Sequence, residues 1–206
     1  MRKFEINGYS KSEGQTLYYL HKIILQALHT YEKGKLLEVG PGQLRLWKQI
    51  EKLHKFEMFG CDLNYPNELI VYCNLNKDNL PYNNEFFDYV ICCEVIEHIH
   101  NPWSLLSEIR RVMKTEGRLI ITTPNVSKIY DRIYYLVKGV LPSFEQTKFT
   151  SEMQHINPIN IQELMLILHE NGFRIGTIRY NVTKKYQRLF PCGLFGYSVA
   201  VFAYKE

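Results

Sequence analysis

The sequence predicts an α/β fold with a doubly wound, mostly parallel sheet, helices on both faces, a cap insertion after the fifth strand and a C-terminal antiparallel hairpin. Three observations predict it. Short apolar runs alternate with segments of helical periodicity, as in parallel βαβ units. The run 87–93 is apolar almost throughout, as in a strand buried on both faces. The turn Gly40-Pro41-Gly42 joins an apolar run to a helical segment, which is how such folds bring backbone N–H groups to a ligand.

Length and composition indicate a single domain, 1–206, with a substantial core. The 46% hydrophobic and 22% charged residues are typical of a soluble globular protein. The net charge of +4 is mild, and basic residues gather only at Lys184, Lys185 and Arg188. We therefore expect a small-molecule partner and no nucleic acid.

Nothing in the sequence has the length and apolar character of a signal peptide or a bilayer span. We therefore expect a cytoplasmic protein without membrane insertion. The cysteines are odd in number and lack C-x-x-C spacing, so neither a disulfide framework nor a metal site is expected. They are Cys61, Cys73, Cys92, Cys93 and Cys192.

The first half of the chain alternates helices and strands. Helical spacing predicts a helix over 12–31, which Gly34 ends, and then a strand over 35–39. After the glycine turn, a helix that begins through Arg45, Leu46 and Trp47 ends near Leu53, and further strands are expected at 56–61, 70–73, 86–93 and 118–123. Asn101 caps a helix whose first residue is Pro102.

The alternation breaks down over 126–158, where we expect a cap over the site that contains a helix near 129–137. A helix begins after Asn160, and strands at about 174–180 and 197–204 complete the chain. Polar or acidic residues follow most strands. Because ligands bind at the carboxyl ends of parallel strands, these residues are candidates for one site. They are Glu38, Asp62, Asn74 and Glu94.

Asp62 allows two interpretations. It follows Gly42 by about 20 residues, the spacing at which an acid accepts from both ribose hydroxyls of a nucleoside ligand. It could instead be a turn or N-cap residue before Pro66.

Four motifs in this order resemble those of class I S-adenosylmethionine-dependent methyltransferases, in particular the small-molecule, ubiquinone-biosynthesis-like subgroup. They are Leu37-Glu38-Val39-Gly40-Pro41-Gly42, Asp62, Leu80-Pro81-Tyr82 before Phe87-Asp88-Tyr89-Val90-Ile91, and Glu94-Val95-Ile96-Glu97-His98-Ile99. The resemblance covers about 36–124, and 34–124 is the expected cofactor-binding half. It implies a Rossmann-like fold and an enzyme that uses S-adenosylmethionine and releases S-adenosylhomocysteine.

The resemblance also implies roles for individual residues. Gly40 and Gly42 pass under the methionine part of the cofactor, where a side chain would occupy the ligand's volume. Glu38 holds the ammonium group and Asp62 the ribose hydroxyls, while Leu63 packs on the adenine. Further along, Asn74 and Leu75 meet the adenine edge, and Cys93 and Glu94 line the place where the methyl group is presented.

Two residues depart from the family pattern. Many relatives have a third glycine where this chain has Leu44, so either the turn differs or the helix starts later. Relatives commonly have aspartate at the position of Asn74, whose neutral amide forgoes a charge-assisted bond. We therefore expect a cofactor dissociation constant above the low micromolar range.

Other functions remain open at this point. A dinucleotide-binding enzyme also needs glycines and a later acid, but Arg45 stands where its last glycine belongs. A non-catalytic protein that keeps the scaffold to bind a partner has only Leu44 and Asn74 in its support. The chain has Glu94-Val95-Ile96-Glu97 where amino-methylating DNA enzymes carry an Asn-Pro-Pro-Tyr type of sequence. That difference favours O- or C-methylation of a small acceptor.

A sulfonium methyl group is already activated, so transfer needs alignment and, for a hydroxyl acceptor, a base. His98 and His155 are the candidate bases. Each also allows a structural interpretation, in which His98 orients its loop and His155 anchors the cap.

Overall fold

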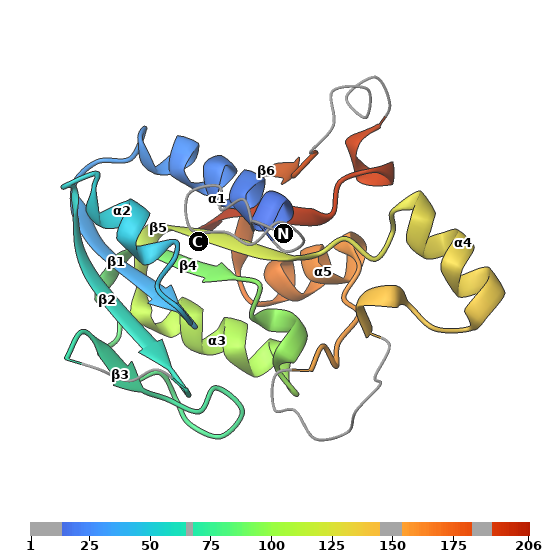
Figure 1. Cartoon of the computed structure of the whole chain (residues 1–206). Coiled ribbons are helices and arrows are strands. Elements are labelled where there is room, and N and C mark those ends of the chain that lie inside the picture. Colours follow the sequence, from blue (N-terminus) through green and yellow to red (C-terminus); the bar gives the residue numbers. More distant parts are fainter. Residues whose placement is uncertain (1–13, 65–67, 145–153, 183–190) are drawn as a thin grey trace.

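The computed structural model describes residues 14–64, 68–144, 154–182 and 191–206, and its centre is a seven-stranded sheet (Figure 1). The strands are β1 (Gly34–Val39), β2 (Phe56–Asp62), β3 (Ile70–Tyr72), β4 (Phe87–Cys93), β5 (Met113–Pro124), β6 (Phe173–Tyr180) and β7 (Ser198–Lys205). Their order is β3-β2-β1-β4-β5-β7-β6, and β1 to β5 run parallel. β7 lies antiparallel between β5 and β6. The predicted doubly wound sheet with its C-terminal antiparallel hairpin is confirmed.

Helices cover both faces of the sheet. They are α1 (Gly14–Leu28), α2 (Trp47–Glu51), α3 (Pro102–Val112), α4 (Ile129–Lys138) and α5 (Ile161–Glu170), with 3-10 turns η1 (Ile96–His98), η2 (Pro142–Phe144) and η4 (Cys192–Leu194). α1 and α2 lie on one face and α3 and α5 on the other (Figure 1). Leu36 packs with the first pair and Leu37 with the second, because successive side chains of a strand point to opposite faces. This explains why the strands are apolar on both sides.

Capping residues act where the sequence predicts them. The Asn101 side chain accepts from Ser104 N ahead of Pro102, and the Asn160 side chain accepts from the backbone N–H groups of Gln162 and Glu163. α4 ends at Gly139, which adopts a left-handed conformation with φ 72°.

Two predicted helix boundaries are wrong. α1 ends at Leu28, where Thr30 bonds back to the Ala27 carbonyl, and Gly34 is the first residue of β1 rather than the end of the helix. α2 begins at Trp47, so Arg45 and Leu46 belong to the turn before it.

Leu44 explains the late start of α2. Its backbone has φ 58°, a left-handed conformation that favours glycine, and its N–H donates to the Pro41 carbonyl at 2.9 Å. Leucine therefore bears the strain of a conformation that glycine adopts without cost.

The strand order places a switch point between β1 and β4. From β1 the chain builds β2 and β3 on one side and then crosses to β4 on the other. Ligands of open α/β sheets bind beyond the carboxyl ends of the strands at such a point. Gly40 follows β1 and Glu94 follows β4, so both lie at the expected place.

The described part of 126–158 comprises α4, η2 and the stretch 154–158, which bonds to the Glu97 carbonyl through Ile156 N and Asn157 N. α4 projects beyond the carboxyl end of β5 (Figure 1), and the element it chiefly contacts is η2. The predicted polar break at 145–148 lies outside the described residues, as does the basic group at 184–188. The role of this segment as a cap stays a prediction. Among the described residues, no helix combines the length and apolar character needed to cross a bilayer.

Candidate functional site

Two adjoining hollows lie at the switch point and share Gly40, Gly42 and Glu94. The first hollow, of about 160 Å³, is also lined by Asp62, Leu63, Asn64, Cys73, Asn74, Leu75, Asn76, Val95, His98 and Ile99. The second hollow, of about 280 Å³, is also lined by Leu17, His21, Glu38, Pro41, Gln43, Arg45, Leu46 and Cys93. All nine predicted cofactor-contacting residues line one hollow or the other. The two hollows join at the glycine turn and Glu94.

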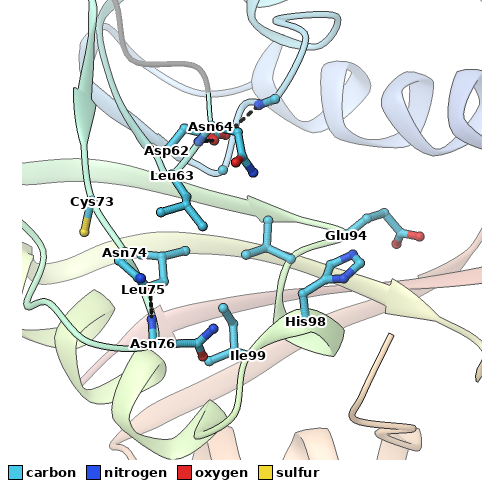
Figure 2. A pocket seen from close by; sticks show the side chains of 13 residues that line it. Asp62, Leu63, Asn64, Cys73, Asn74, Leu75, Asn76, Glu94, His98 and Ile99 are labelled. Atoms are coloured by element: carbon cyan, nitrogen blue, oxygen red, sulfur yellow. Dashed lines mark hydrogen bonds between the residues drawn. The ribbon is translucent and has the colours of Figure 1, made fainter. Parts of the chain in front are cut away.

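Asp62 lies at one side of the first hollow, across from Glu94 and His98 (Figure 2). Its Oδ2 accepts from Gly42 N at 2.9 Å and its Oδ1 from Asn64 N at 2.8 Å. The residue thus has the turn-forming role that the sequence left open, and it also ties the end of β2 to the glycine turn. Each carboxylate oxygen has a second lone pair, so Asp62 can still accept from hydroxyl groups of a ligand.

Asn74 and Leu75 line the same hollow beside Leu63 (Figure 2). The Asn74 Oδ1 accepts from Asn76 N at 3.1 Å, and the backbone N–H of Asn74 donates to Asp78 Oδ2 at 2.9 Å. The Asn74 amide is therefore fixed in place. It retains one acceptor lone pair on its oxygen.

Glu38 is the most unusual side chain of the second hollow. It is 3% exposed, and its Oε2 has no hydrogen-bond partner within the described residues. Burial raises the pKa of Glu38 to about 8, and the nearby Asp62 carboxylate adds to the rise. A buried carboxylate oxygen without a partner is costly unless a cation or donor meets it. The hollow therefore suits a ligand that carries an ammonium group.

Glu94 stands where the two hollows meet and has a left-handed backbone with φ 54°. Thr122 donates to its Oε1 at 2.9 Å and Ser198 to its Oε2 at 3.2 Å. Burial raises the pKa of Glu94 to about 7, against the opposing effect of these two hydroxyls. The neighbouring Cys93 thiol has a pKa raised chiefly by burial, so it lines the second hollow as a neutral group.

Both glycines of the turn have a left-handed backbone, with φ 67° at Gly40 and φ 51° at Gly42. A Cβ atom on Gly42 would meet no described protein atom within 4 Å, so a side chain there would extend into open space at the hollows. A Cβ atom on Gly40 would instead lie 2.6 Å from Cγ2 of Val95. Contact with Val95 and φ 67° both require glycine at this position, whereas the predicted conflict of a Gly40 side chain with the ligand's volume stays a prediction.

The rings of the two candidate bases, His98 and His155, lie side by side. The carbonyl that orients His98 belongs to Gln154, 56 residues further along the chain. The ring centroids of His98 and His155 are 4.7 Å apart, and His98 Nδ1 lies 3.0 Å from the Gln154 carbonyl. Burial lowers the pKa of His98; burial and the neighbouring His98 lower that of His155 to about 4. Both rings are thus neutral near pH 7 and can accept a proton. Only His98 lines the first hollow.

Glu97 lies behind the histidines. It is fully buried, its Oε1 lacks a partner among the described residues, and it is 4.0 Å from His155 Nε2. Burial and the nearby Glu94 raise its pKa well above the usual range. Ligand atoms of Glu97, His98 and His155 lie within 4.8 Å of one another, so the three could hold a metal ion. The expectation of no metal site rests on the spacing of the cysteines, and this group contains no cysteine.

Sequence reasoning missed the contribution of α1 and the turn to the second hollow. Leu17 and His21 line it from α1, and Arg45 lines it from the turn. No local motif marks the first two, because they reach the site only through packing of α1 on the sheet. In the sequence, Arg45 indicates only a helix start and the absence of the last dinucleotide-site glycine.

Together, the fold and the hollows define an α/β protein whose site suits a nucleoside linked to an ammonium-bearing group. Comparison with known families agrees: the sequence model of a family described as "Methyltransferase domain" matches residues 13–177. The chain thus belongs to this family of methyltransferase domains, as predicted. The match also argues against the dinucleotide-binding alternative.

Three relatives illustrate the similarity. An uncharacterized protein of Methanocaldococcus jannaschii is 27% identical over 162 residues, which cover 75% of this chain and 72% of that protein. The mitochondrial ubiquinone biosynthesis O-methyltransferase of Rattus norvegicus is 30% identical over 112 residues, 52% of this chain and 30% of the rat protein. A crystal structure of a SAM-dependent methyltransferase from Archaeoglobus fulgidus superposes with a TM-score of 0.65 at 18% identity, covering 93% of this chain and 94% of that one.

Proposed function

We propose that this enzyme transfers the methyl group of S-adenosylmethionine to an oxygen or carbon of a small-molecule acceptor by in-line displacement. The observation that carries the proposal is the pair of joined hollows. One offers Asp62 with apolar and amide groups suited to an adenosine. The other offers Glu38, whose Oε2 has no partner among the described residues and which is suited to an ammonium. The O-methyltransferase name of the rat relative supports oxygen as the acceptor atom.

The nine cofactor contacts predicted from the sequence are part of this proposal. Asp62 accepts from the ribose hydroxyls, Leu63 packs on the adenine, and Asn74 and Leu75 meet its edge. Gly40, Gly42 and Glu94, which line both hollows, would hold the part of the cofactor between its adenosine and its amino-acid end. Bound there, the cofactor supplies an activated methyl group, and the chain supplies position and exclusion of water.

His98 and His155 are the proposed bases for a hydroxyl acceptor. Both are neutral and lie together beside the first hollow, so either can take a proton as the new bond forms. The same groups with Glu97 could instead hold a divalent cation, so chelation separates the two mechanisms. The histidine-base mechanism predicts that a chelator leaves the rate unchanged.

The methyl acceptor can be identified directly by labelling. Cell extract is incubated with the protein and methyl-labelled S-adenosylmethionine, and labelled products are separated by size and polarity. We expect label in small molecules with an oxygen or carbon acceptor. Label found only in nucleic acid would contradict the proposed substrate class.

A cytoplasmic location stays a prediction from the sequence.

Asp62→Ala is expected to weaken cofactor binding by about 1–3 kcal/mol, since it removes charge-assisted bonds to the ribose. Calorimetry with S-adenosylhomocysteine measures the change. Asp88→Ala is the matched control, because Asp88 likewise accepts a backbone bond, from Lys35 N at 2.8 Å, but at the opposite end of the sheet. Equal affinity of Asp62→Ala and wild type would refute the ribose role.

Asn74→Asp is expected to tighten binding several-fold by restoring a charged acceptor at the adenine edge, worth on the order of 1 kcal/mol. The change nearly conserves the volume of the side chain. The same calorimetry tests it, and unchanged or weaker binding would show that Asn74 does not meet the exocyclic amine. The wild-type dissociation constant itself is expected to lie above the low micromolar range.

A further inference from the structure

The outward side of α4 is apolar. Its large apolar side chains recur at the i, i+4, i+7 and i+8 spacing that places residues on one face of a helix. In a globular domain such a face normally packs on the core. Here it is exposed to solvent, by 85% at Leu136 and 72% at Val137. We define the apolar face of α4 as Ile129, Tyr130, Ile133, Leu136 and Val137, all of which are exposed.

The polar side of α4 faces the protein instead. Asp131 is 1% exposed and is the buried residue of the helix. Its Oδ2 accepts from Lys128 Nζ at 2.5 Å, and the same ammonium donates to the Asn125 carbonyl at 3.3 Å. Asp131 lies roughly 160° around the helix from Ile133, at 3.6 residues per turn. The buried ion pair therefore holds α4 with its apolar face turned outward.

α4 also stands at one end of the molecule. It projects beyond the carboxyl end of β5, and the described element that it chiefly contacts is η2 (Figure 1). Val140, just after the helix, is exposed as well, so the apolar character continues past Gly139. A large surface can therefore approach the apolar face without first meeting the sheet.

The exposed charges beside the apolar face are positive. The charges of Lys128 and Asp131 cancel within their ion pair, which leaves Arg132 and Lys138. Both are exposed, and helical spacing places them on either side of the apolar face. The exposed Tyr130 and Tyr135 add rings of the amphipathic kind that accumulate where a bilayer meets water. An apolar face flanked by basic residues and tyrosines is typical of a helix that lies in the surface of an anionic bilayer.

We propose that α4 binds the surface of bilayers that contain anionic lipids. The apolar face lies at the boundary between headgroups and acyl chains, and Arg132 and Lys138 meet the lipid phosphates. The ten residues of α4 span about 15 Å, roughly half of the hydrocarbon core, so the helix lies along the bilayer and does not cross it. No residue of α4 lines either hollow, so this inference is independent of the proposed function.

Sedimentation with vesicles tests the proposal on the full chain. One set of vesicles contains phosphatidylcholine alone, and the other contains equal amounts of phosphatidylcholine and phosphatidylglycerol. The bound fraction is measured against lipid concentration. We expect the wild type to bind the mixed vesicles about 10-fold or more tightly than the neutral ones, because Arg132 and Lys138 each add attraction. Added salt is expected to reduce this preference.

The apolar face is tested by Leu136→Ser combined with Val137→Ser. This variant is expected to bind the mixed vesicles about 10-fold or more weakly, because it removes apolar area that the bilayer would cover. Its affinity for S-adenosylhomocysteine is expected to equal that of the wild type. Met165→Ser combined with Leu166→Ser is the matched control, since it changes two adjacent exposed apolar residues on α5. The control is expected to bind vesicles as the wild type does.

The basic residues are tested by Arg132→Gln combined with Lys138→Gln. This variant keeps the apolar face, so its binding to phosphatidylcholine vesicles is expected to equal that of the wild type. Its preference for phosphatidylglycerol is expected to disappear. A preference as large as that of the wild type would show that these two residues do not meet the lipid phosphates, and would contradict the proposed binding mode.

Three results would overturn the proposal. The first is a wild type that binds neither kind of vesicle. The second is an equal loss of binding in the α4 and α5 serine variants, because binding would then not depend on the apolar face. The third is a dimeric wild type, seen by light scattering, that Leu136→Ser with Val137→Ser converts to a monomer while vesicles bind neither. That result would assign the face to a second copy of the chain. Calorimetry with S-adenosylhomocysteine tests the proposed function separately.

Discussion

His155→Gln is expected to slow methyl transfer by about 100-fold or more, the usual contribution of a general base. Cofactor affinity is expected to stay unchanged, because His155 does not line the two hollows. The experiment uses the acceptor identified by labelling and compares kcat with the dissociation constant for S-adenosylhomocysteine. His169→Gln is the matched control, because His169 is an exposed histidine at the end of α5.

The pH dependence gives a second test of His155. Burial and His98 lower its pKa to about 4, so the ring stays neutral and able to accept a proton down to about pH 5. A histidine with the ordinary pKa of about 6.5 would lose rate below that pH. The wild-type rate is therefore expected to show no histidine limb between pH 5 and 6.5. A limb near pH 7 would belong to Glu94, whose pKa burial raises to about 7.

An equal loss of rate in His98→Gln and His155→Gln would show that the rings act as a unit. A loss in His98→Gln alone would assign the base to His98, which lines the first hollow. Full activity in both variants would contradict the histidine mechanism.

Cofactor affinity is expected to rise from pH 6 to pH 8 through Glu38. Burial raises the pKa of its carboxyl to about 8, so in the free enzyme it is protonated below that pH and must lose the proton to bind an ammonium. Each pH unit below 8 can therefore weaken binding by up to about tenfold. Calorimetry with S-adenosylhomocysteine at pH 6, 7 and 8, in buffers of different ionisation heat, measures both the affinity and the released proton.

Glu38→Gln supplies the control. The amide is nearly isosteric and cannot ionise, so the variant is expected to bind S-adenosylhomocysteine more weakly at pH 8 and to release no proton at this site. 5′-Methylthioadenosine lacks the ammonium, so its affinity should be equal for the wild type and Glu38→Gln and should not vary with pH through this site. A proton release by Glu38→Gln equal to that of the wild type would assign the titration to another group.

The same shift bears on stability. Because the folded-state pKa of Glu38 lies above its unfolded value, the folded protein binds the extra proton, and stability falls as the pH rises through the window from about 4.5 to about 8. The ligand-free wild type is thus expected to melt at a lower temperature at pH 8 than Glu38→Gln. A bound cofactor ammonium would remove this difference.

Much of the fold follows from local sequence signals. Strands buried on both faces are apolar at successive residues, as at Leu36 and Leu37, and helix ends carry their caps, as at Asn101 and Asn160. Short-range chemistry decides these features. The end of α1 could not be read in this way, because Gly34 satisfies the rule for a helix end while hydrogen bonding to β2 makes it a strand residue.

The candidate site likewise has a part that local sequence signals predict and a part that they do not. Residues at strand ends, such as Glu38 and Asp62, could be predicted because parallel strands bring their carboxyl ends to one edge. His21 could not, because only the packing of α1 brings it to the hollow. That Glu38 Oε2 has no partner among the described residues could not be predicted either, because it depends on every neighbour in space.

The most direct test of the account is calorimetry of the wild-type protein with S-adenosylmethionine and S-adenosylhomocysteine at pH 8. The account predicts one site per chain for each ligand, with competition between them. No heat with either ligand would contradict it and favour a scaffold that serves only to bind a partner.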